Sequence, residues 1–384
     1  MRWHAVICFL FMYLFLVGNN HALAKWELQS ILPKMTWEQH PLGYTLPDKV
    51  GENLNWVELQ NRLGGTREII CFHDTDFSTW ESALPVLQGW IGNQVGREVT
   101  LIAPAIHDKA REIMLRQIKR CFDRPIRYRC DKRYLLKENG IVFWWVEKEI
   151  GKFNFGYSVA QQDVDAYAKR DYGKPVRSMT RGMLPPKLAQ IMINGIQPTK
   201  IDRVWDPFCG TGTVLIEAAL MNILTIGSDK DTSALQSTKE NISHLLTHQQ
   251  QATIGQIWQQ DVTLPWQDYV TQATAIVAEG YLGKPQKEQV SNPSALRPFW
   301  QDVEPLYQKF FTRLLKSSIT RMVLATPLVQ TNNDLSRLAV RTWNILLQAG
   351  WKKVFQADYI RTGQIVGREI TYLMQDAKFN MQNA

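Results

Sequence analysis

The stretch Asp206–Thr213, with the sequence DPFCGTGT, constrains the fold of this chain more than any other segment. It follows the short apolar segment Val204–Trp205 and precedes an apolar run, Val214–Leu220. A strand that ends on an acid, a glycine turn and a helix lets the backbone approach a ligand closely, because Gly210 and Gly212 carry no Cβ. The N-terminus of the helix adds free N–H groups and a partial positive charge. The pattern therefore predicts a strand–loop–helix cradle for a small molecule with an anionic group.

The sequence after this loop distinguishes between nucleotide-type ligands. A dinucleotide fingerprint requires a third Gly or Ala three residues after the second glycine, and Leu215 occupies that position. Ile223–Asp229 predicts a second strand that ends on an acid able to accept both ribose hydroxyls, although Asp231 competes for this role. Asp261, at a third strand end, is placed to meet an adenine or is an ordinary turn residue. Acids at three successive strand tips lie where open α/β sheets bind ligands.

Several segments together resemble one enzyme family. The loop resembles the S-adenosylmethionine (AdoMet) loop of class I RNA methyltransferases and is most similar to that of the THUMP-domain tRNA guanine-N2 methyltransferases. The resemblance covers most of the chain and is strongest from about Tyr157 onward. Two further segments, Ala166–Pro175 and Arg181–Ala189, resemble the family's entry segment. Gln364–Ile370 resembles its last hairpin, and Leu63–Thr66 resembles part of its N-terminal domain.

This resemblance implies a fold class and a domain order. The expected fold is α/β, with a C-terminal Rossmann-like class I methyltransferase domain, whose doubly wound sheet is mainly parallel, and an N-terminal α+β RNA-binding region. The alternation of apolar strand and helix patterns after Pro186 agrees with such a sheet. The expected parts are a ferredoxin-like domain over residues 12–75, a THUMP-like RNA-binding domain over 76–155, a linker over 156–186 and the AdoMet-dependent domain over 187–384.

The resemblance also implies an activity, a cofactor and a partner. The chain is expected to be a cytoplasmic AdoMet-dependent enzyme that methylates the N2 amine of a guanosine in tRNA. The sequence leaves open whether a helper subunit takes part. The residues expected to bind the cofactor S-adenosyl-L-methionine are Asp206, Pro207, Phe208, Gly210, Gly212, Asp229 and Asp261.

The tip of the fourth predicted strand departs from the family's pattern. The family places Asp or Asn, two prolines and an aromatic there, and the first residue accepts a hydrogen bond from the target amine. The aligned residues here are Ala278, Glu279, Gly280 and Tyr281. Glu279 and Tyr281 are therefore the expected catalytic residues, with Glu279 orienting the amine and Tyr281 stacking on the base. The alternatives are a non-catalytic AdoMet-binding RNA-binding protein and a DNA or protein amine methyltransferase.

Positive charge is concentrated in one segment of the chain. The formal net charge is +8, and residues 107–137 hold eleven Lys or Arg residues against four acids, with aromatics among them. Such a segment suits a phosphate backbone with exposed bases, while the alternative is a solvated helix face followed by a basic strand. The residues expected to contact RNA are Lys109, Arg116, Lys119, Arg120, Arg127, Arg129, Lys132 and Arg133.

Other residue patterns argue against further chemistry. Five cysteines without a CxxC pair disfavour a disulfide framework or a zinc site. His244 and His248 lack an evident third ligand, so no metal is expected. Cys209 is expected to be a small packing residue, since no base partner is evident. The cations of the expected linker form an exposed face or guide RNA toward the pocket; they are Arg170, Lys174, Arg177 and Arg181.

The N-terminus has two interpretations. Ala5–Val17 is an apolar run behind Arg2, and Ala22–Ala24 resembles a small-residue cleavage site, as in a signal peptide. The run is too short to predict a membrane span, and no membrane partner is expected. The favoured interpretation is a buried strand, Tyr13–Val17, followed by a helix from about residue 23 to 32. Met12 is then the expected start, with residues 1–11 upstream of it.

Overall fold

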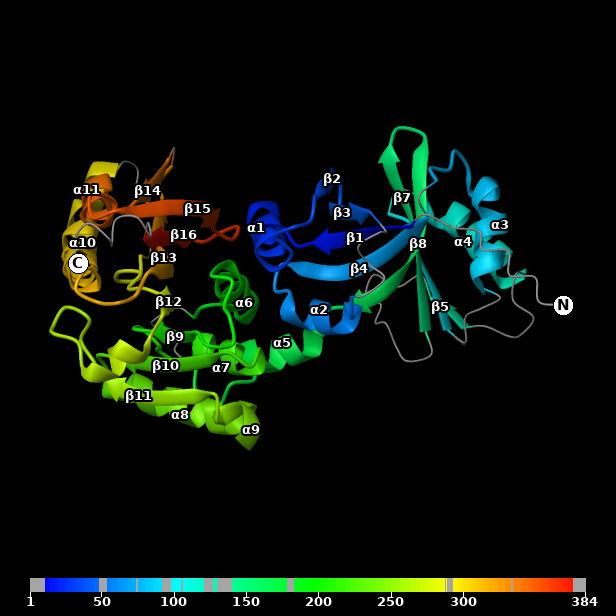
Figure 1. The fold of residues 1–384 in the computed structure, drawn as a ribbon. Coiled ribbons are helices and arrows are strands. Elements are labelled where there is room, and N and C mark those ends of the chain that lie inside the picture. Colours follow the sequence, from blue (N-terminus) through cyan, green and yellow to red (C-terminus); the bar gives the residue numbers. More distant parts are fainter. Residues whose placement is uncertain are drawn as a thin grey trace. The chain divides into compact units, whose positions relative to one another are not determined.

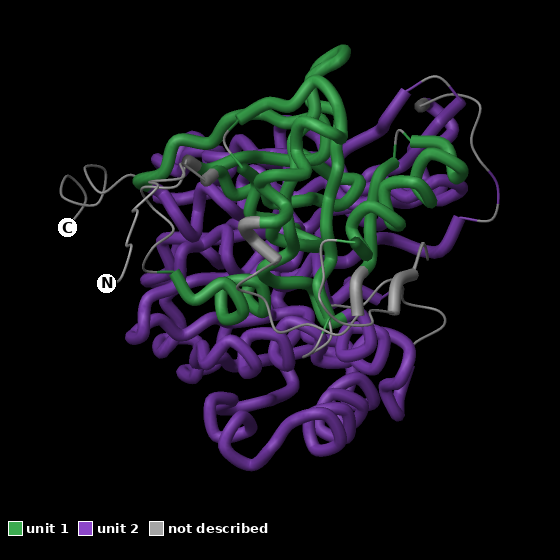
Figure 2. Tube along the Cα trace, turned by 90° about the vertical axis from the view of Figure 1, so that its right-hand side faces the viewer, with its two compact units in different colours: residues 1–21, 34–62, 66–163 green, residues 22–33, 63–65, 164–384 purple. Residues whose placement is uncertain are grey.

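The computed structural model describes residues 11–47, 54–73, 75–91, 98–104, 106–120, 127–129, 140–177, 183–286, 288, 293–332 and 334–375. The chain divides into two compact units, which Figure 2 distinguishes by colour. Unit 1 contains residues 1–21, 34–62 and 66–163, and unit 2 contains residues 22–33, 63–65 and 164–384. Each unit builds a β-sheet of its own (Figure 1).

The sheet of unit 1 consists of β1 (Phe11–Val17), β2 (Glu38–His40), β3 (Gly43–Pro47), β4 (Thr66–His73), β5 (Glu98–Ile102), β6 (Arg127–Arg129), β7 (Gly140–Glu149) and β8 (Lys152–Gln161). Its strand order is β2-β3-β1-β4-β8-β7-β5-β6. β5 pairs in parallel with β6 and β7, and the other neighbours pair antiparallel. The helices are α2 (Trp56–Arg62), α3 (Trp80–Ile91) and α4 (Asp108–Arg120), which agrees with the expected α+β composition.

The strand expected near the N-terminus lies inside this sheet. β1 pairs with β3 on one side and with β4 on the other, so it is not an edge strand. Leu14 and Phe15 are fully buried, and Leu14 packs with Ile70 and Phe72 of β4. The apolar run that resembles a signal peptide is therefore, over residues 11–17, a core strand of unit 1.

The expected boundary between residues 75 and 76 does not separate compact units. β4 pairs with β8, with Cys71 opposite Tyr157, so the two expected N-terminal domains share one sheet. The expected linker, 156–186, begins inside β8 and contains α5 (Val164–Asp171). Alternating apolar residues in β8 form cross-strand pairs with β7, and this pairing extends the sheet into the expected linker. The structural boundary lies at residues 163 and 164.

The elements of unit 2 are α1 (His21–Ile31), α5, α6 (Pro186–Gly195), β9 (Arg203–Asp206), α7 (Thr213–Leu220), β10 (Leu224–Asp229), α8 (Thr232–Leu245), α9 (His248–Gln251), β11 (Ile254–Gln259), β12 (Ala275–Glu279), α10 (Arg297–Leu314), β13 (Arg321–Gln330), β14 (Leu335–Arg337), α11 (Val340–Leu347), β15 (Trp351–Tyr359) and β16 (Val366–Gln375). The sheet has the order β11-β10-β9-β12-β13-β16-β15, and β14 pairs with β13. The first five strands of this order run parallel, while β16 and β15 are antiparallel to their neighbours.

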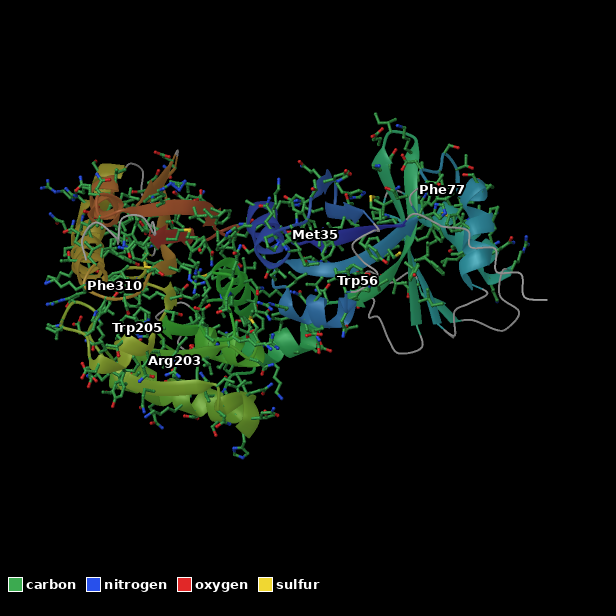
Figure 3. The ribbon with its side chains drawn as sticks, viewed as in Figure 1. Met35, Trp56, Phe77, Arg203, Trp205 and Phe310 are labelled. Atoms are coloured by element: carbon green, nitrogen blue, oxygen red, sulfur yellow. The ribbon has the colours of Figure 1, made fainter. Side chains whose placement is uncertain are left out.

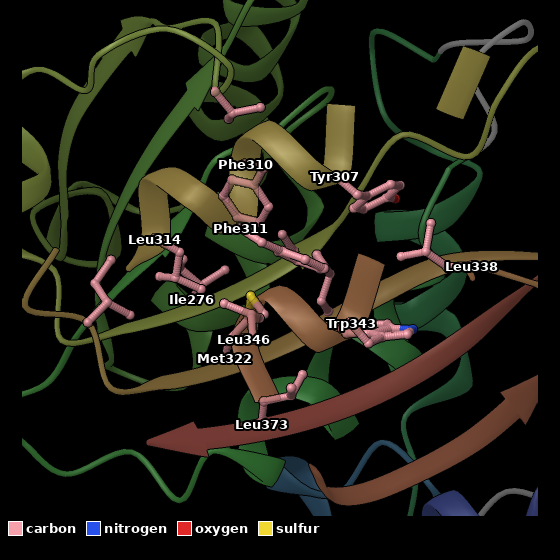
Figure 4. Packing of buried hydrophobic residues seen from close by; sticks show 14 of the residues in the cluster. Ile276, Tyr307, Phe310, Phe311, Leu314, Met322, Leu338, Trp343, Leu346 and Leu373 are labelled. Atoms are coloured by element: carbon pink, nitrogen blue, oxygen red, sulfur yellow. The ribbon is translucent and has the colours of Figure 1, made fainter. Parts of the chain in front are cut away.

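Helices cover both faces of this sheet, as the doubly wound fold class predicts. On one face, α10 and α11 pack on alternate residues of β9, β12 and β13 (Figure 4). Trp205 is fully buried in this layer, in the same unit as Phe310 (Figure 3). On the other face, α1, α6 and α7 pack on the intervening residues of the same strands. The carboxyl ends of β9, β10 and β12 therefore meet at one edge between two helical layers.

A segment from the N-terminal part of the chain completes unit 2. Glu27 of α1 is fully buried, and its carboxylate accepts hydrogen bonds from the backbone N–H groups of Gly64 (2.9 Å) and Gly65 (2.8 Å). Asn194 of α6 donates a third hydrogen bond of 2.7 Å. A Cβ on Gly64 would lie 2.2 Å from the carbonyl oxygen of Lys187, so the close approach requires glycine.

Candidate active site

The loop after β9 adopts the predicted cradle. Gly210 and Gly212 have φ values of 53° and 84°, a region that favours glycine. A Cβ on Gly212 would also lie 3.0 Å from Cγ2 of Thr238, so both the backbone conformation and the available space select glycine there. α7 begins at Thr213, and its first turn places backbone N–H groups beside the loop.

Two side chains of α8 hold this loop from behind. The Thr238 hydroxyl donates a hydrogen bond of 2.8 Å to the carbonyl of Gly210. Asn241 donates to the carbonyls of Thr211 and Val176, each at 3.0 Å, and accepts from the N–H of Val176 at 3.0 Å. Asn241 is fully buried, and it joins the loop after β9 to Val176. Sequence reasoning did not identify either residue, because α8 reads as an ordinary amphipathic helix.

Asp206 at the tip of β9 is a buried carboxylate. Its side chain is 2% exposed, and Oδ1 accepts a hydrogen bond of 3.0 Å from the N–H of Phe208. Burial raises the pKa of Asp206 well above its ordinary value, and the charges of Asp229 and Glu279 raise this pKa further. The hydrogen bond from Phe208 acts in the opposite direction. A cationic ligand group next to Asp206 would supply the counter-charge that burial makes favourable.

The structure separates the two acids that compete at the tip of β10. Asp231 caps α8, because its Oδ1 accepts a hydrogen bond of 2.8 Å from the N–H of Ser233. Asp229 instead accepts from the N–H of Gly210 at 3.0 Å and from the N–H of Asp231 at 3.0 Å. Each carboxylate oxygen of Asp229 uses one lone pair in this way and retains another for a ligand.

Asp261 follows β11 and makes the local turn that was its alternative role. Its Oδ1 accepts hydrogen bonds from the N–H and the hydroxyl of Thr263, both at 2.8 Å. The preceding Gln260 uses its side-chain amide to brace the same turn against Pro265 and Gln267. The turn places Asp261 at the wall of a cavity together with Asp229.

Two adjoining cavities lie along these strand tips. The larger, of about 470 Å³, is lined by Asp229, Asp261, the segment Glu279–Pro285 and neighbouring residues. The smaller, of about 50 Å³, is lined by Asp206, the loop, Met183 and Leu184. Three residues line both cavities: Phe208, Gly210 and Glu279. Of the residues predicted for the cofactor, six line one or both of these cavities, with Glu279 at the junction, whereas Gly212 lines neither.

Glu279 at the tip of β12 forms an ion pair that the sequence did not reveal. Its Oε1 accepts a hydrogen bond from Nε of Arg368 on β16. Nη2 of the same guanidinium donates to the carbonyl of Met183 at 3.2 Å. The aligned acceptor position of the family, Ala278, is fully buried in the layer beneath α10. Ala278 and Glu279 therefore face opposite sides of the sheet.

Tyr281 is fixed at both its side chain and its backbone. Its hydroxyl donates a hydrogen bond of 2.7 Å to Asp302 of α10, and its carbonyl accepts one of 2.9 Å from the hydroxyl of Tyr307. Burial, followed by the bond to Asp302 and the charge of Asp302, raises the pKa of Tyr281 to about 12. Tyr281 therefore remains a neutral phenol near pH 7. Nζ of Lys230 lies 5.7 Å from the ring centroid.

Two of the four linker cations are neither exposed nor free to meet RNA. Lys174 is 5% exposed, and its Nζ donates a hydrogen bond of 2.6 Å to the hydroxyl of Thr213 at the start of α7. Arg170 pairs with the buried Glu217 of α7 at 2.7 Å. The expectation of an exposed or RNA-guiding role is therefore wrong for these two residues, because both side chains bind residues of α7. Arg177 is exposed, and Arg181 lies outside the described residues.

The basic segment forms the expected helix in unit 1. On α4, the side chains of Lys109, Arg116, Lys119 and Arg120 are exposed, and Arg116 lies 3.6 Å from the carboxylate of Glu112. Met114, Leu115 and Ile118 pack the opposite face into the core of unit 1. Arg127 and Arg129 belong to β6, but their side chains are outside the described part of the structure, as are Lys132 and Arg133.

Comparisons with known proteins establish the fold. TrmN from Thermus thermophilus aligns with a TM-score of 0.54 and 16% identity, covering 96% of this chain and 100% of that chain. A possible methylase from Clostridium difficile 630 aligns with a TM-score of 0.53 and 13% identity, covering 96% and 98%. Residues 175–265 match the model of the UPF0020 family, described as the RMKL-like methyltransferase domain. Unit 2 has the class I methyltransferase fold.

Curated relatives match shorter parts of the chain. The tRNA (guanine(10)-N2)-dimethyltransferase of Methanothermobacter thermautotrophicus is 46% identical over 63 residues, 16% of this chain and 19% of that protein. The protein of the same name from Pyrococcus abyssi is 30% identical over 100 residues, 26% of this chain and 27% of that protein. These matches span about a fifth to a quarter of the relatives' lengths. They confirm the resemblance that the sequence motifs indicate.

Other expectations concern groups outside this site. Among the residues that the structure describes, no group of three or more His, Cys, Asp or Glu side chains could hold a metal ion. No helix within the described ranges is long and apolar enough to cross a membrane. Cys209 is buried beside Leu215 and Ile216 of α7, as expected of a packing residue.

Proposed function

We propose that the chain is an AdoMet-dependent RNA methyltransferase of the cytoplasm that acts on tRNA, with the N2 amine of a guanosine as its target. The observation that carries the proposal is the joint lining of adjoining cavities by Asp206, Asp229 and Asp261 at the tips of a class I methyltransferase sheet. The sequence similarity to tRNA (guanine(10)-N2)-dimethyltransferases supports the substrate and the target atom.

The residues present fit AdoMet. The methionine end carries an ammonium group, which suits the buried carboxylate of Asp206 and its raised pKa. Its carboxylate suits the N–H groups at the start of α7. The ribose hydroxyls suit the free lone pairs of Asp229, and the adenine suits the turn at Asp261. The proposed cofactor-binding residues are Asp206, Pro207, Phe208, Gly210, Gly212, Asp229 and Asp261.

The reaction assigns different tasks to the cofactor and to this chain. AdoMet supplies an electrophilic methyl group on a sulfonium. Glu279 accepts a hydrogen bond from the target amine, which directs the nitrogen lone pair at the junction of the two cavities. Tyr281 provides a neutral aromatic surface for the base. Transfer forms a C–N bond and breaks a C–S bond, and the amine loses one proton to Glu279 or to water.

RNA binding is assigned to the basic face of unit 1. Lys109, Arg116 and Arg120 recur along α4 at helical spacing, and their side chains are exposed. Contacts of this kind neutralise phosphates and release counter-ions, so affinity for tRNA should fall steeply as salt rises. Salt-independent binding of tRNA would contradict this assignment. The full proposed set is Lys109, Arg116, Lys119, Arg120, Arg127, Arg129, Lys132 and Arg133.

The test of the proposed function is transfer of a tritiated methyl group from AdoMet to bulk tRNA, followed by nucleoside analysis of the product. Label in N2-methylguanosine or N2,N2-dimethylguanosine is expected. The matched variants are Glu279→Gln, which should lose transfer while it retains AdoMet binding, and Glu240→Gln on α8, which should transfer like the unaltered chain. Label in another nucleoside would retain the enzyme class and reject the target.

The altered sequence at the tip of β12 favours a second candidate function. Ala278 stands where the family has an acid or amide, and both prolines of the motif are absent. A non-catalytic, AdoMet-binding RNA-binding protein would bind the cofactor and tRNA without any transfer. Transfer to DNA or to a protein amine, with none to tRNA, would instead support an amine methyltransferase of another substrate class. The same labelled AdoMet, offered with each acceptor, separates the three outcomes.

A further inference from the structure

Glu279 and Ala278 lie on opposite faces of β12, and this changes how Glu279 reaches the site. Ala278 packs with Tyr307 and other residues of α10. The preceding Val277 packs with the α6 layer, and Glu279 shares the side of Val277 because strand residues alternate. Glu279 thus replaces the family's acceptor from the other face of the strand, so the chain needs a different means of orienting it.

Arg368 supplies a rigid support on that face. It lies on β16 opposite Pro327 of β13, and its side chain is 6% exposed. The guanidinium donates from Nε to Oε1 of Glu279 and from Nη2 to the carbonyl of Met183. The planar fork of arginine fixes these two acceptors relative to each other, which the flexible ammonium of lysine cannot do. Among the described residues, no side chain donates to the other oxygen, Oε2, of Glu279.

The charges around Glu279 make this partner necessary. Asp206 on β9 and Asp229 on β10 carry like charge, and the charge of Glu279 contributes to raising the pKa of Asp206. On α10, Tyr307 also has a raised pKa, due first to burial and then to Glu279. Lys174 also has an electrostatic interaction with Glu279, but its hydrogen bond goes to Thr213. Without Arg368, Glu279 would share a low-dielectric edge with two carboxylates.

We propose that Arg368 is a positioning residue for methyl transfer: it holds Glu279 through Oε1, presents Oε2 to the target amine, and fixes Met183 beside the cofactor loop. This inference rests on the proposed function, because it assigns the means by which Glu279 acts in that reaction. The role belongs to this chain's altered strand tip, in which the acceptor has moved to the opposite face of β12.

The test compares pH profiles of kcat for tRNA methylation in the full chain, Arg368→Gln and Arg368→Lys. Because the positive charge of Arg368 is removed from the site, the acid limb of kcat in Arg368→Gln should move up by about one pH unit or more. At pH 7 its kcat should fall about tenfold or more and recover toward pH 9, with KM for tRNA little changed. Arg368→Lys retains the charge, so its acid limb should stay in place while kcat falls severalfold.

Arg337→Gln is the matched control. Arg337 also makes Arg–carboxylate pairs in this sheet, with Asp358 and Glu369, but it lines neither cavity. Thermal unfolding of each variant identifies losses of fold, and the control's acid limb should not move. If Arg368→Gln does not fold, the Arg368→Lys variant tests the proposal by itself. An unchanged kcat in Arg368→Lys would overturn the positioning role.

The outcomes distinguish this inference from the proposed function. An active full chain whose acid limb is unmoved in Arg368→Gln overturns the role of Arg368 alone. An equal shift of the acid limb in Arg337→Gln also overturns the role of Arg368, because the shift would then not depend on contact with Glu279. No transfer by the full chain to any tRNA rejects the proposed function, and the role of Arg368 with it.

Discussion

The carboxylate of Asp229 accepts a hydrogen bond of 3.0 Å from the backbone N–H of Gly210, which ties the tip of β10 to the loop after β9. Its second oxygen accepts from the N–H of Asp231 at 3.0 Å. The same carboxylate lines the larger cavity. Asp229 therefore holds the glycine loop and lines the larger cavity, so its removal alters both.

Replacing Asp229 by Ala should weaken AdoMet binding by about 30-fold or more, because two backbone donors lose their acceptor and the ribose loses its own. Isothermal calorimetry with AdoMet measures this. The control is Asp231→Ala, which removes the cap of α8 and should lower the free energy of unfolding by about 1 kcal/mol. Asp231 also lines the larger cavity, so its loss should weaken AdoMet binding, but far less than the loss of Asp229. Equal losses of affinity in both variants would reject the ribose role of Asp229.

Asp206 should make AdoMet binding release protons. Burial raises the pKa of Asp206 in the free protein, and an ammonium group beside it would lower that pKa again. Between these two pKa values the free protein holds a proton that the complex does not, so binding at a pH in this interval should release one. Calorimetry in buffers of different ionisation enthalpy counts the protons.

The variant Asp206→Asn provides the control for this linkage. It cannot ionise, so the buffer dependence of the binding enthalpy should disappear while affinity falls. The effect in the unaltered protein should also fade at a pH above the raised pKa of Asp206, where the free carboxylate is already ionised. A buffer dependence that persists in Asp206→Asn would assign the proton to another group.

The features that the sequence predicted are those encoded by neighbouring residues. The acid, the glycines and the helix start of the loop lie within eight residues, and the apolar runs that end at Asp206 and Asp229 predicted the strands β9 and β10, which pair in parallel. Arg368 and Glu279, by contrast, are 89 residues apart, and Asn241 and Val176 are 65 apart. Sheet closure and helix packing create these pairs, so no local pattern in a single sequence identifies them.

The domain boundary also depends on contacts between residues that are distant in sequence. The resemblance implied a linker over residues 156–186, but β8 enters the sheet through pairing with β7 and with β4, which is distant in sequence. The sequence likewise did not reveal that Lys174 is buried. Its burial depends on Thr213, which is 39 residues away along the chain.

Asn241→Ala should destabilise unit 2 and loosen the cofactor loop together. The variant leaves the carbonyl of Thr211 and both backbone groups of Val176 without the partner they have in a partly buried place, which costs about 2 kcal/mol of unfolding free energy. Chemical denaturation and AdoMet titration measure the two effects. Ser237→Ala on the exposed side of α8 is the control and should change neither. A stable Asn241→Ala protein with full affinity for AdoMet would contradict the view that Asn241 holds the loop in place.

The N-terminal strand can be tested by truncation. A chain that starts at Met12 retains nearly all of β1 and should unfold like the full chain, whereas one that starts at Lys25 lacks a central strand and should lose cooperative unfolding of unit 1. Leu14→Ala should cost about 2–5 kcal/mol, as expected of a fully buried leucine. Circular dichroism during denaturation measures all three. A native protein found by N-terminal sequencing to begin at Lys25 would support the signal-peptide interpretation.

Lys174 should leave a signature in stability at alkaline pH. Burial lowers its pKa to about 8, despite the opposing charges of Glu217 and Asp171. Between this pKa and the ordinary value of 10.5, the unfolded chain binds more protons, so Lys174 makes the free energy of unfolding rise with pH. Lys174→Met lacks this contribution, and its stability relative to the unaltered protein should fall by on the order of 3 kcal/mol across that window. Denaturation at pH 7.5 and pH 10.5 measures the change, with the exposed Lys200→Met as the control that should show none. A difference that is flat with pH would mean that Lys174 titrates as it would in water.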